Sequence, residues 1–173
     1  MKTLEQELRD LLQTCDQKWA GPGHVNTISS SSLKAWNNFL RIHRKNPLLG
    51  NLLAEQLLQI PLTQKARQYA AIVGLTWHSG PAARSFLEKL LLSDDLELNR
   101  EDIVEAIHRI GDPLSFPALI KALGIEDITD GLHPKIVHAL VDIDKDKTKA
   151  FFQSFVTDNT YLAWTIEESL KEE

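Results

Sequence analysis

The sequence predicts an all-α fold, and more specifically an α-solenoid of stacked helical hairpins. Apolar residues recur every three to four positions along almost the whole chain, and this pattern repeats with a period of 33 residues. No segment alternates apolar and polar residues between hairpin turns, so no strand is expected. With 173 residues, 43% hydrophobic and 25% charged, the chain is long enough to bury a core and is expected to form a single domain over 1–173.

Helix boundaries are indicated by proline, glycine and capping residues. Gly21-Pro22-Gly23 ends the first helix, and the polar segment 26–32 is expected to be a loop. Thr63 and Asn99 are candidate N-caps, and Gly111-Asp112-Pro113 marks a tight turn. The expected helices are 4–19, 33–45, 48–60, 64–78, 82–92, 100–110, 114–123, 134–143, 147–156 and 159–171.

The repeat becomes visible when residues 106–123 are shifted by 33 positions. The segment then aligns without gaps on 139–156, on 73–90 and on 40–57. Four positions keep their character: an apolar or small residue of the first helix, the turn residue, and two apolar residues of the second helix. In chain order these are Leu40, Val73, Ala106 and Ala139; Pro47, Gly80, Pro113 and Asp146; Leu53, Phe86, Leu119 and Phe152; and Leu57, Leu90, Leu123 and Val156.

The turn at 111–113, followed by the apolar second helix 118–123, resembles the HEAT-like (armadillo-type) α-solenoid repeats of the short kind found in phycobilin lyase subunits. The resemblance covers residues 33–157 and is weakest in the first copy, where Arg44 replaces an apolar residue. It implies a right-handed solenoid of about four hairpins, with capping helices at 1–20 and 158–173. It brings no catalytic residues, and the usual role of this family is protein binding.

Motifs for catalysis or metal binding are missing from the sequence. Cys15 is the single cysteine, which excludes internal disulfides and cysteine zinc cages. No His-Glu pair occurs, so the metal-binding repeats of the HEAT-like deoxyhypusine hydroxylase are not matched. The run at 142–146 starts like a calcium loop, but Lys147 replaces the required glycine. No phosphate-binding loop or nucleophile elbow occurs. A non-enzymatic protein without a metal or cofactor is therefore expected.

The apolar runs and the N-terminal segment of the sequence indicate where in the cell the protein is expected. No apolar run approaches the roughly 18 residues that a membrane span needs. The N-terminal segment carries Glu5 and Glu7 where a signal peptide has an apolar stretch. A cytoplasmic protein without membrane contact is expected.

The net charge of −5 conceals an asymmetry along the chain. Residues 1–86 carry ten Lys and Arg against five Asp and Glu, whereas residues 87–173 carry nine against nineteen. Acids gather in the two loops that lead into successive first helices, which lie close together in a stacked repeat. They predict a docking surface for a basic protein, although carboxylates are also favoured at helix N-termini and in soluble loops. The candidate residues are Asp94, Asp95, Glu97, Glu101, Asp102, Glu105, Glu126, Asp127 and Asp130.

Three classes of function fit these observations. The first is a binding module, most concretely an immunity or inhibitor protein that neutralises a nuclease-like bacterial toxin. The second is a phycobilin-lyase-like subunit, or a scaffold. The third is a nucleic-acid-binding glycosylase of the HEAT-like kind; the strongly acidic second half opposes it, and Trp36 and Trp77 lie on apolar stripes typical of a core. Nucleic acid is therefore an unlikely partner, and the sequence leaves the oligomeric state open.

Overall fold

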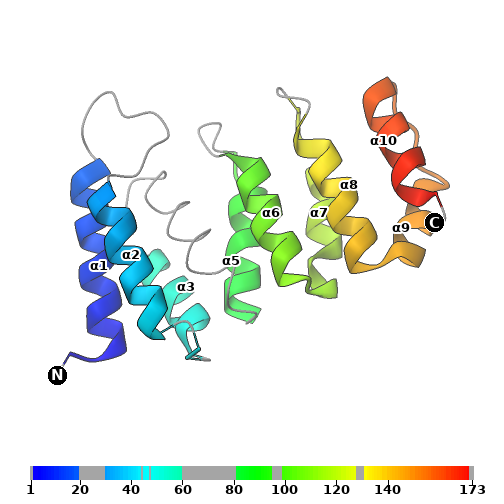
Figure 1. Ribbon diagram of the computed structural model, residues 1–173. Helices are drawn as coiled ribbons and strands as arrows, with labels where there is room; N and C mark the ends of the chain where they lie inside the picture. The colour runs from blue at the N-terminus through cyan, green and yellow to red at the C-terminus, as the bar shows by residue number, and fades with distance from the viewer. Residues whose placement is uncertain are drawn as a thin grey trace. The chain divides into compact units, whose positions relative to one another are not determined.

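The computed structural model describes residues 2–19, 30–43, 45–46, 48–59, 81–94, 99–127 and 131–171. Throughout these ranges the secondary structure is helical, with no strand (Figure 1), so the predicted all-α class is confirmed. The helices are α1 (Leu4–Trp19), α2 (Ser30–His43), α3 (Leu49–Gln59), α5 (Pro81–Leu91), α6 (Arg100–Ile110), the short 3-10 helix η1 (Pro113–Ser115), α7 (Phe116–Ala122), α8 (Leu132–Ile143), α9 (Lys145–Phe152) and α10 (Thr160–Leu170).

The chain divides into two compact units. Unit 1 comprises residues 1–86 and 95–98, and unit 2 comprises residues 87–94 and 99–173. Unit 1 carries ten Lys and Arg against seven Asp and Glu, whereas unit 2 carries nine against seventeen. The charge asymmetry of the sequence is therefore a difference between two compact parts of the molecule.

In unit 1, α1 packs against α2 and α3. Thr3 begins α1 with a reciprocal capping box: its hydroxyl accepts a hydrogen bond from the Gln6 amide at 3.2 Å, and the Gln6 side chain accepts one from the Thr3 amide at 3.1 Å. Side chains spaced at helical intervals form the core, so the amphipathic pattern explains the packing. The fully buried ones include Leu8, Leu12, Trp36, Leu49, Leu53 and Leu57.

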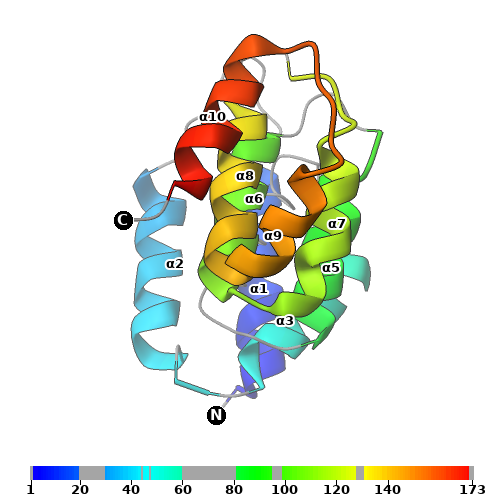
Figure 2. The same ribbon diagram turned by 90° about the vertical axis from the view of Figure 1, so that its right-hand side faces the viewer.

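In unit 2, α6 packs on α8 and α8 packs on α10, while α7 and α9 lie against α8. Helices α6, α8 and α10 run in the same direction, so their N-terminal ends lie along one edge of the unit (Figures 1 and 2). Ile103 and Ile107 of α6 are fully buried, and so are their counterparts 33 residues later, Ile136 and Leu140 of α8. Gly111 ends α6 with a φ of +65°, a conformation that side chains other than glycine rarely adopt.

Burial follows the 33-residue register with one exception. Leu53, Phe86, Leu119 and Phe152 are all buried, as their alignment predicts. Of the closing positions, those at residues 57, 90 and 123 are buried, but Val156 is 88% exposed. The expectation of an apolar contact at residue 156 is therefore wrong.

Several helix boundaries differ from those expected. Helix α2 begins at Ser30, inside the segment expected to be a loop, and the rest of that loop and the expected helix at 64–78 lie outside the described residues. Helix α9 begins at Lys145 because Asp144 caps it, its carboxylate accepting from the Lys147 amide at 2.9 Å. It ends at Phe152, one turn earlier than expected. None of the helices described here is both long and apolar enough to span a bilayer.

Candidate functional site

The first acidic residues of unit 2 lie at the start of α6. The Asn99 side chain caps α6 by accepting from the Asp102 amide at 3.3 Å, which places Glu101 and Asp102 in the first helical turn. Carboxylates are favoured there by the partial positive charge of the helix end. The Arg100 guanidinium donates to the carbonyl oxygens of Leu91 at 3.2 Å and Ser93 at 2.7 Å. These bonds hold the turn that follows α5, with the exposed Asp94, against the start of α6.

Glu101 reaches the beginning of the neighbouring first helix, α8. Its carboxylate lies so close to Gly131, the N-cap of α8, that a Cβ on Gly131 would be 2.7 Å from Oε1. The acids at the start of α6 and the loop that leads into α8 therefore lie side by side. We call the edge formed by the N-terminal turns of α6, α8 and α10 and by residues 124–127 the N-terminal edge of unit 2.

Asp127 in this loop serves the fold. Its carboxylate accepts from the backbone amides of Leu132 at 3.2 Å and His133 at 2.8 Å, and so satisfies two free donors at the start of α8. The His133 Nε2 atom lies 2.9 Å from the carbonyl oxygen of Ile125, which closes the loop further. The Asp127 side chain is only 4% exposed. It is therefore a capping residue with little surface to offer a partner, unlike its exposed neighbour Glu126.

We expect Asp127→Ala to lower the free energy of unfolding by about 2 kcal/mol, because two backbone donors lose a charged acceptor. The matched change Glu126→Ala removes the adjacent exposed carboxylate and is expected to cost less than about 0.5 kcal/mol. Urea unfolding followed by circular dichroism measures both. Equal losses for the two variants would contradict the capping role of Asp127.

Asp102, in the first turn of α6, and Glu105, in the next turn, differ in their surroundings. The Arg109 guanidinium pairs with Glu105 through Nε at 3.1 Å and Nη2 at 3.0 Å, and the Lys135 ammonium lies 3.9 Å from the other oxygen of Glu105. Partial burial raises the pKa of Asp102, Lys135 opposes this, and Glu101 and Glu105 reinforce it. Protonated Asp102 thus favours the folded state below the ordinary aspartate pKa, and this contribution is lost as the pH rises through the raised pKa.

The remaining predicted residues of the surface, Asp95, Glu97 and Asp130, lie outside the described residues. The acidic run 142–146 lies outside the N-terminal edge, at the C-terminal end of α8 and the start of α9. There His108 Nε2 contacts Asp142 at 2.7 Å and Asp144 caps α9. These two carboxylates therefore link and cap helices at the edge opposite to the candidate surface.

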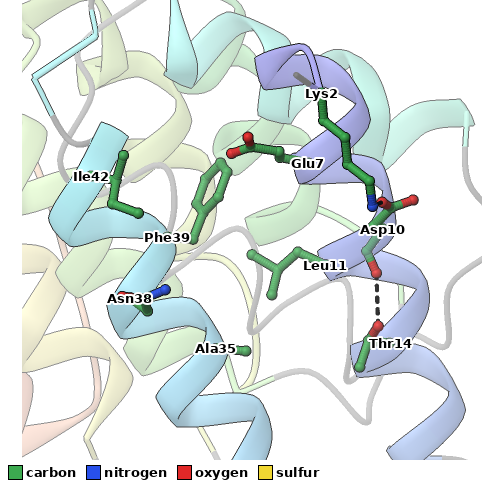
Figure 3. A pocket seen from close by; sticks show the side chains of 9 residues that line it. All are labelled: Lys2, Glu7, Asp10, Leu11, Thr14, Ala35, Asn38, Phe39 and Ile42. Carbon is green, nitrogen blue, oxygen red and sulfur yellow. Dashed lines mark hydrogen bonds and ion pairs between the residues drawn. The ribbon is translucent and has the colours of Figure 1, made fainter.

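Unit 1 has a shallow groove of about 320 Å³ between α1 and α2 (Figure 3). Leu11 and Phe39 form part of its apolar lining, while Lys2, Glu7 and Asp10 line it with charge. Both carboxylates are paired: Asp10 with Lys2 at 2.5 Å, and Glu7 with His43 at 2.7 Å. Of these two pairs, Glu7–His43 joins α1 to α2, whereas Lys2–Asp10 lies within the N-terminal segment and α1.

An exposed aromatic pair lies on α10, outside the residues that the sequence predicts for the candidate surface. The rings of Tyr161 and Trp164 stack with centroids 5.9 Å apart, and the residues are 48% and 53% exposed. The signal was their spacing of three along the helix, beside the buried stripe formed by Leu162 and Thr165.

Across the ranges that the structure describes, no three His, Cys, Asp or Glu side chains form a group able to hold a metal ion. Comparisons with protein-family models, curated proteins and solved structures find no match for the chain. In unit 2 the N-terminal edge offers exposed carboxylates and α10 offers an exposed aromatic pair.

Proposed function

We propose that this protein is a non-enzymatic binding module that binds a basic protein through the N-terminal edge of unit 2. The observation that carries this proposal is the position of Glu101 and Asp102 in the first turn of α6, beside the loop that holds Glu126 and leads into α8, in a unit where seventeen acids outnumber nine bases. A negative surface of this kind steers a positive partner and accelerates association.

The proposed architecture is a right-handed HEAT-like solenoid of about four hairpins, with α1 and α10 as capping helices. Its support is the order of first and second helices, α6 with α7 and α8 with α9, and the shared burial of residues 53, 86, 119 and 152. In such a stack each hairpin buries its apolar stripe against its neighbours, and equivalent helix ends line one edge. In that arrangement the acidic first turn of α6 and the loop that holds Glu126 belong to one continuous edge.

The most concrete form of the proposed role is an immunity or inhibitor protein for a nuclease-like bacterial toxin. A nuclease binds polyanionic substrate through a cationic cleft. Carboxylates spaced along an edge can occupy such a cleft in place of phosphates, without any reaction. This role needs no metal, no cofactor and no catalytic residue in the binding protein.

The test is a titration of the whole chain with a fluorescein-labelled nona-arginine peptide, followed by fluorescence anisotropy at about 20 mM and about 150 mM salt. Asp102→Asn/Glu126→Gln removes two exposed carboxylates of the edge. We expect affinity about fivefold weaker than that of the unchanged chain at the lower salt, together with a weaker dependence on salt.

The matched control is Glu55→Gln/Asp146→Asn, which removes two exposed carboxylates elsewhere and gives the same net charge. Its affinity is expected to stay within about twofold of the unchanged chain. Equal losses in both double variants would show that only net charge matters, and would overturn the assignment of the surface. Failure of the unchanged chain to bind the peptide would overturn the proposed function.

A further inference from the structure

Helix α10 is the last helix of unit 2 (Figure 2), and it exposes aromatic surface. The helix packs on α8 and α9 and buries Leu162 and Thr165. Tyr161 and Trp164 lie on the exposed side that adjoins this buried stripe and contact each other, at about half exposure each. Val156, just before α10, is 88% exposed. A terminal helix of a stacked repeat usually turns a polar face to solvent, so this aromatic face is unusual for a cap.

The charges beside this face are predominantly negative. Asp158 precedes α10, and Glu167 and Glu168 follow one turn after Trp164, all three exposed. Lys171 is paired with Glu168. Two copies that met through this same face would bring like charges together within a unit of net negative charge, which disfavours self-association. The complementary occupant is a basic protein.

Arginine is the side chain that matches both properties of the face. Its planar guanidinium stacks on an aromatic ring, with a preference for tryptophan, and at the same time donates to carboxylates. Lysine has a compact, strongly hydrated charge that gains less from the ring. Tryptophan, tyrosine and arginine are also the residues most often found at the energetic centres of protein interfaces.

We infer that Trp164, stacked with Tyr161, is an anchor that holds an arginine side chain of the basic partner beside the N-terminal edge of unit 2. Tyr161 lies in the first turn of α10, and the N-terminal ends of α6, α8 and α10 lie along one edge of unit 2 (Figure 1). That edge carries the acids of the first turn of α6. The acids attract the partner, and the aromatic pair selects arginine over lysine. This inference rests on the proposed function and names the partner chemistry that the function uses.

The test compares labelled nona-arginine with labelled nona-lysine, two peptides of equal charge, in anisotropy titrations of the whole chain. We expect the unchanged chain to prefer nona-arginine by about fivefold or more. Trp164→Ala is expected to weaken nona-arginine binding about fivefold while leaving nona-lysine binding within about twofold. Because Trp164 is half exposed, circular dichroism should report an unchanged fold and midpoint.

Trp164→Leu keeps an apolar side chain but removes the ring, and is expected to lose the arginine preference as Trp164→Ala does. Leu114→Ala, at an exposed apolar residue of η1, is the matched control and should change neither affinity. If the unchanged chain binds both peptides equally, or Trp164→Ala leaves the preference intact, the anchor is overturned and the acidic surface stands. If neither peptide binds, both fail. Sedimentation that shows a dimer broken by Trp164→Ala would assign the face to a second copy and overturn the inference.

Discussion

Leu123→Ala is expected to lower the free energy of unfolding by about 3 kcal/mol, whereas Val156→Ala is expected to lower it by less than about 0.5 kcal/mol. The two residues occupy the same position of the 33-residue register, and both lie in unit 2. Leu123 is 8% exposed, so its truncation leaves a cavity, while Val156 is 88% exposed and loses almost no buried surface. The measurement is urea unfolding at fixed pH, followed by circular dichroism.

The contrast arises where the second helix of the last hairpin stops. The Phe155 amide donates to the Phe152 carbonyl, and the Ser154 amide and hydroxyl donate to the Phe151 carbonyl, so the chain turns after Phe152. Val156 therefore lies beyond the helix that would have directed it inward. Similar costs for Leu123→Ala and Val156→Ala would mean that residue 156 is buried in solution, and would contradict this geometry.

The helical class and much of the packing follow from the sequence because apolar spacing determines which side of a helix is buried. Leu53, Phe86, Leu119 and Phe152 were aligned by period alone, and all are buried. Ends of helices were less predictable. Helix α8 starts at Leu132 because the Asp127 carboxylate, five residues earlier, accepts from its backbone amide. Such a contact depends on the conformation of the loop, which apolar spacing does not determine.

The candidate surface was only partly predictable for the same reason. Glu126 and Asp127 are adjacent acids that the sequence alone does not distinguish. Glu126 is exposed, whereas Asp127 caps α8 with a nearly buried carboxylate. Charge composition identifies where acids gather, but hydrogen bonding decides which of them remain available. The aromatic face of α10 is not predicted from the sequence, because apolar periodicity indicates the buried side of a helix. Trp164 lies on the exposed side.

Trp36→Ala is expected to lower the free energy of unfolding by about 4 kcal/mol. Trp36 is fully buried in unit 1, and its ring meets that of Phe39 edge to face, with centroids 6.1 Å apart. Removing the indole leaves a large cavity that the neighbouring helices cannot fill without strain. Thermal and urea unfolding measure the loss, and Trp36→Phe, which keeps a ring, is expected to cost about half as much.

Trp36 is expected to contribute to stability, and Trp164 is expected to contribute to recognition of the partner. A protein that binds nucleic acid by stacking bases on aromatic rings needs those rings at its surface, but Trp36 is fully buried. Trp36→Ala should therefore cost stability while leaving nona-arginine affinity within about twofold under conditions where the variant is folded. Trp164→Ala should instead leave the stability unchanged and weaken nona-arginine binding about fivefold. A folded Trp36→Ala variant that loses the peptide at unchanged stability would place recognition on α2 and contradict the assignment of recognition to unit 2.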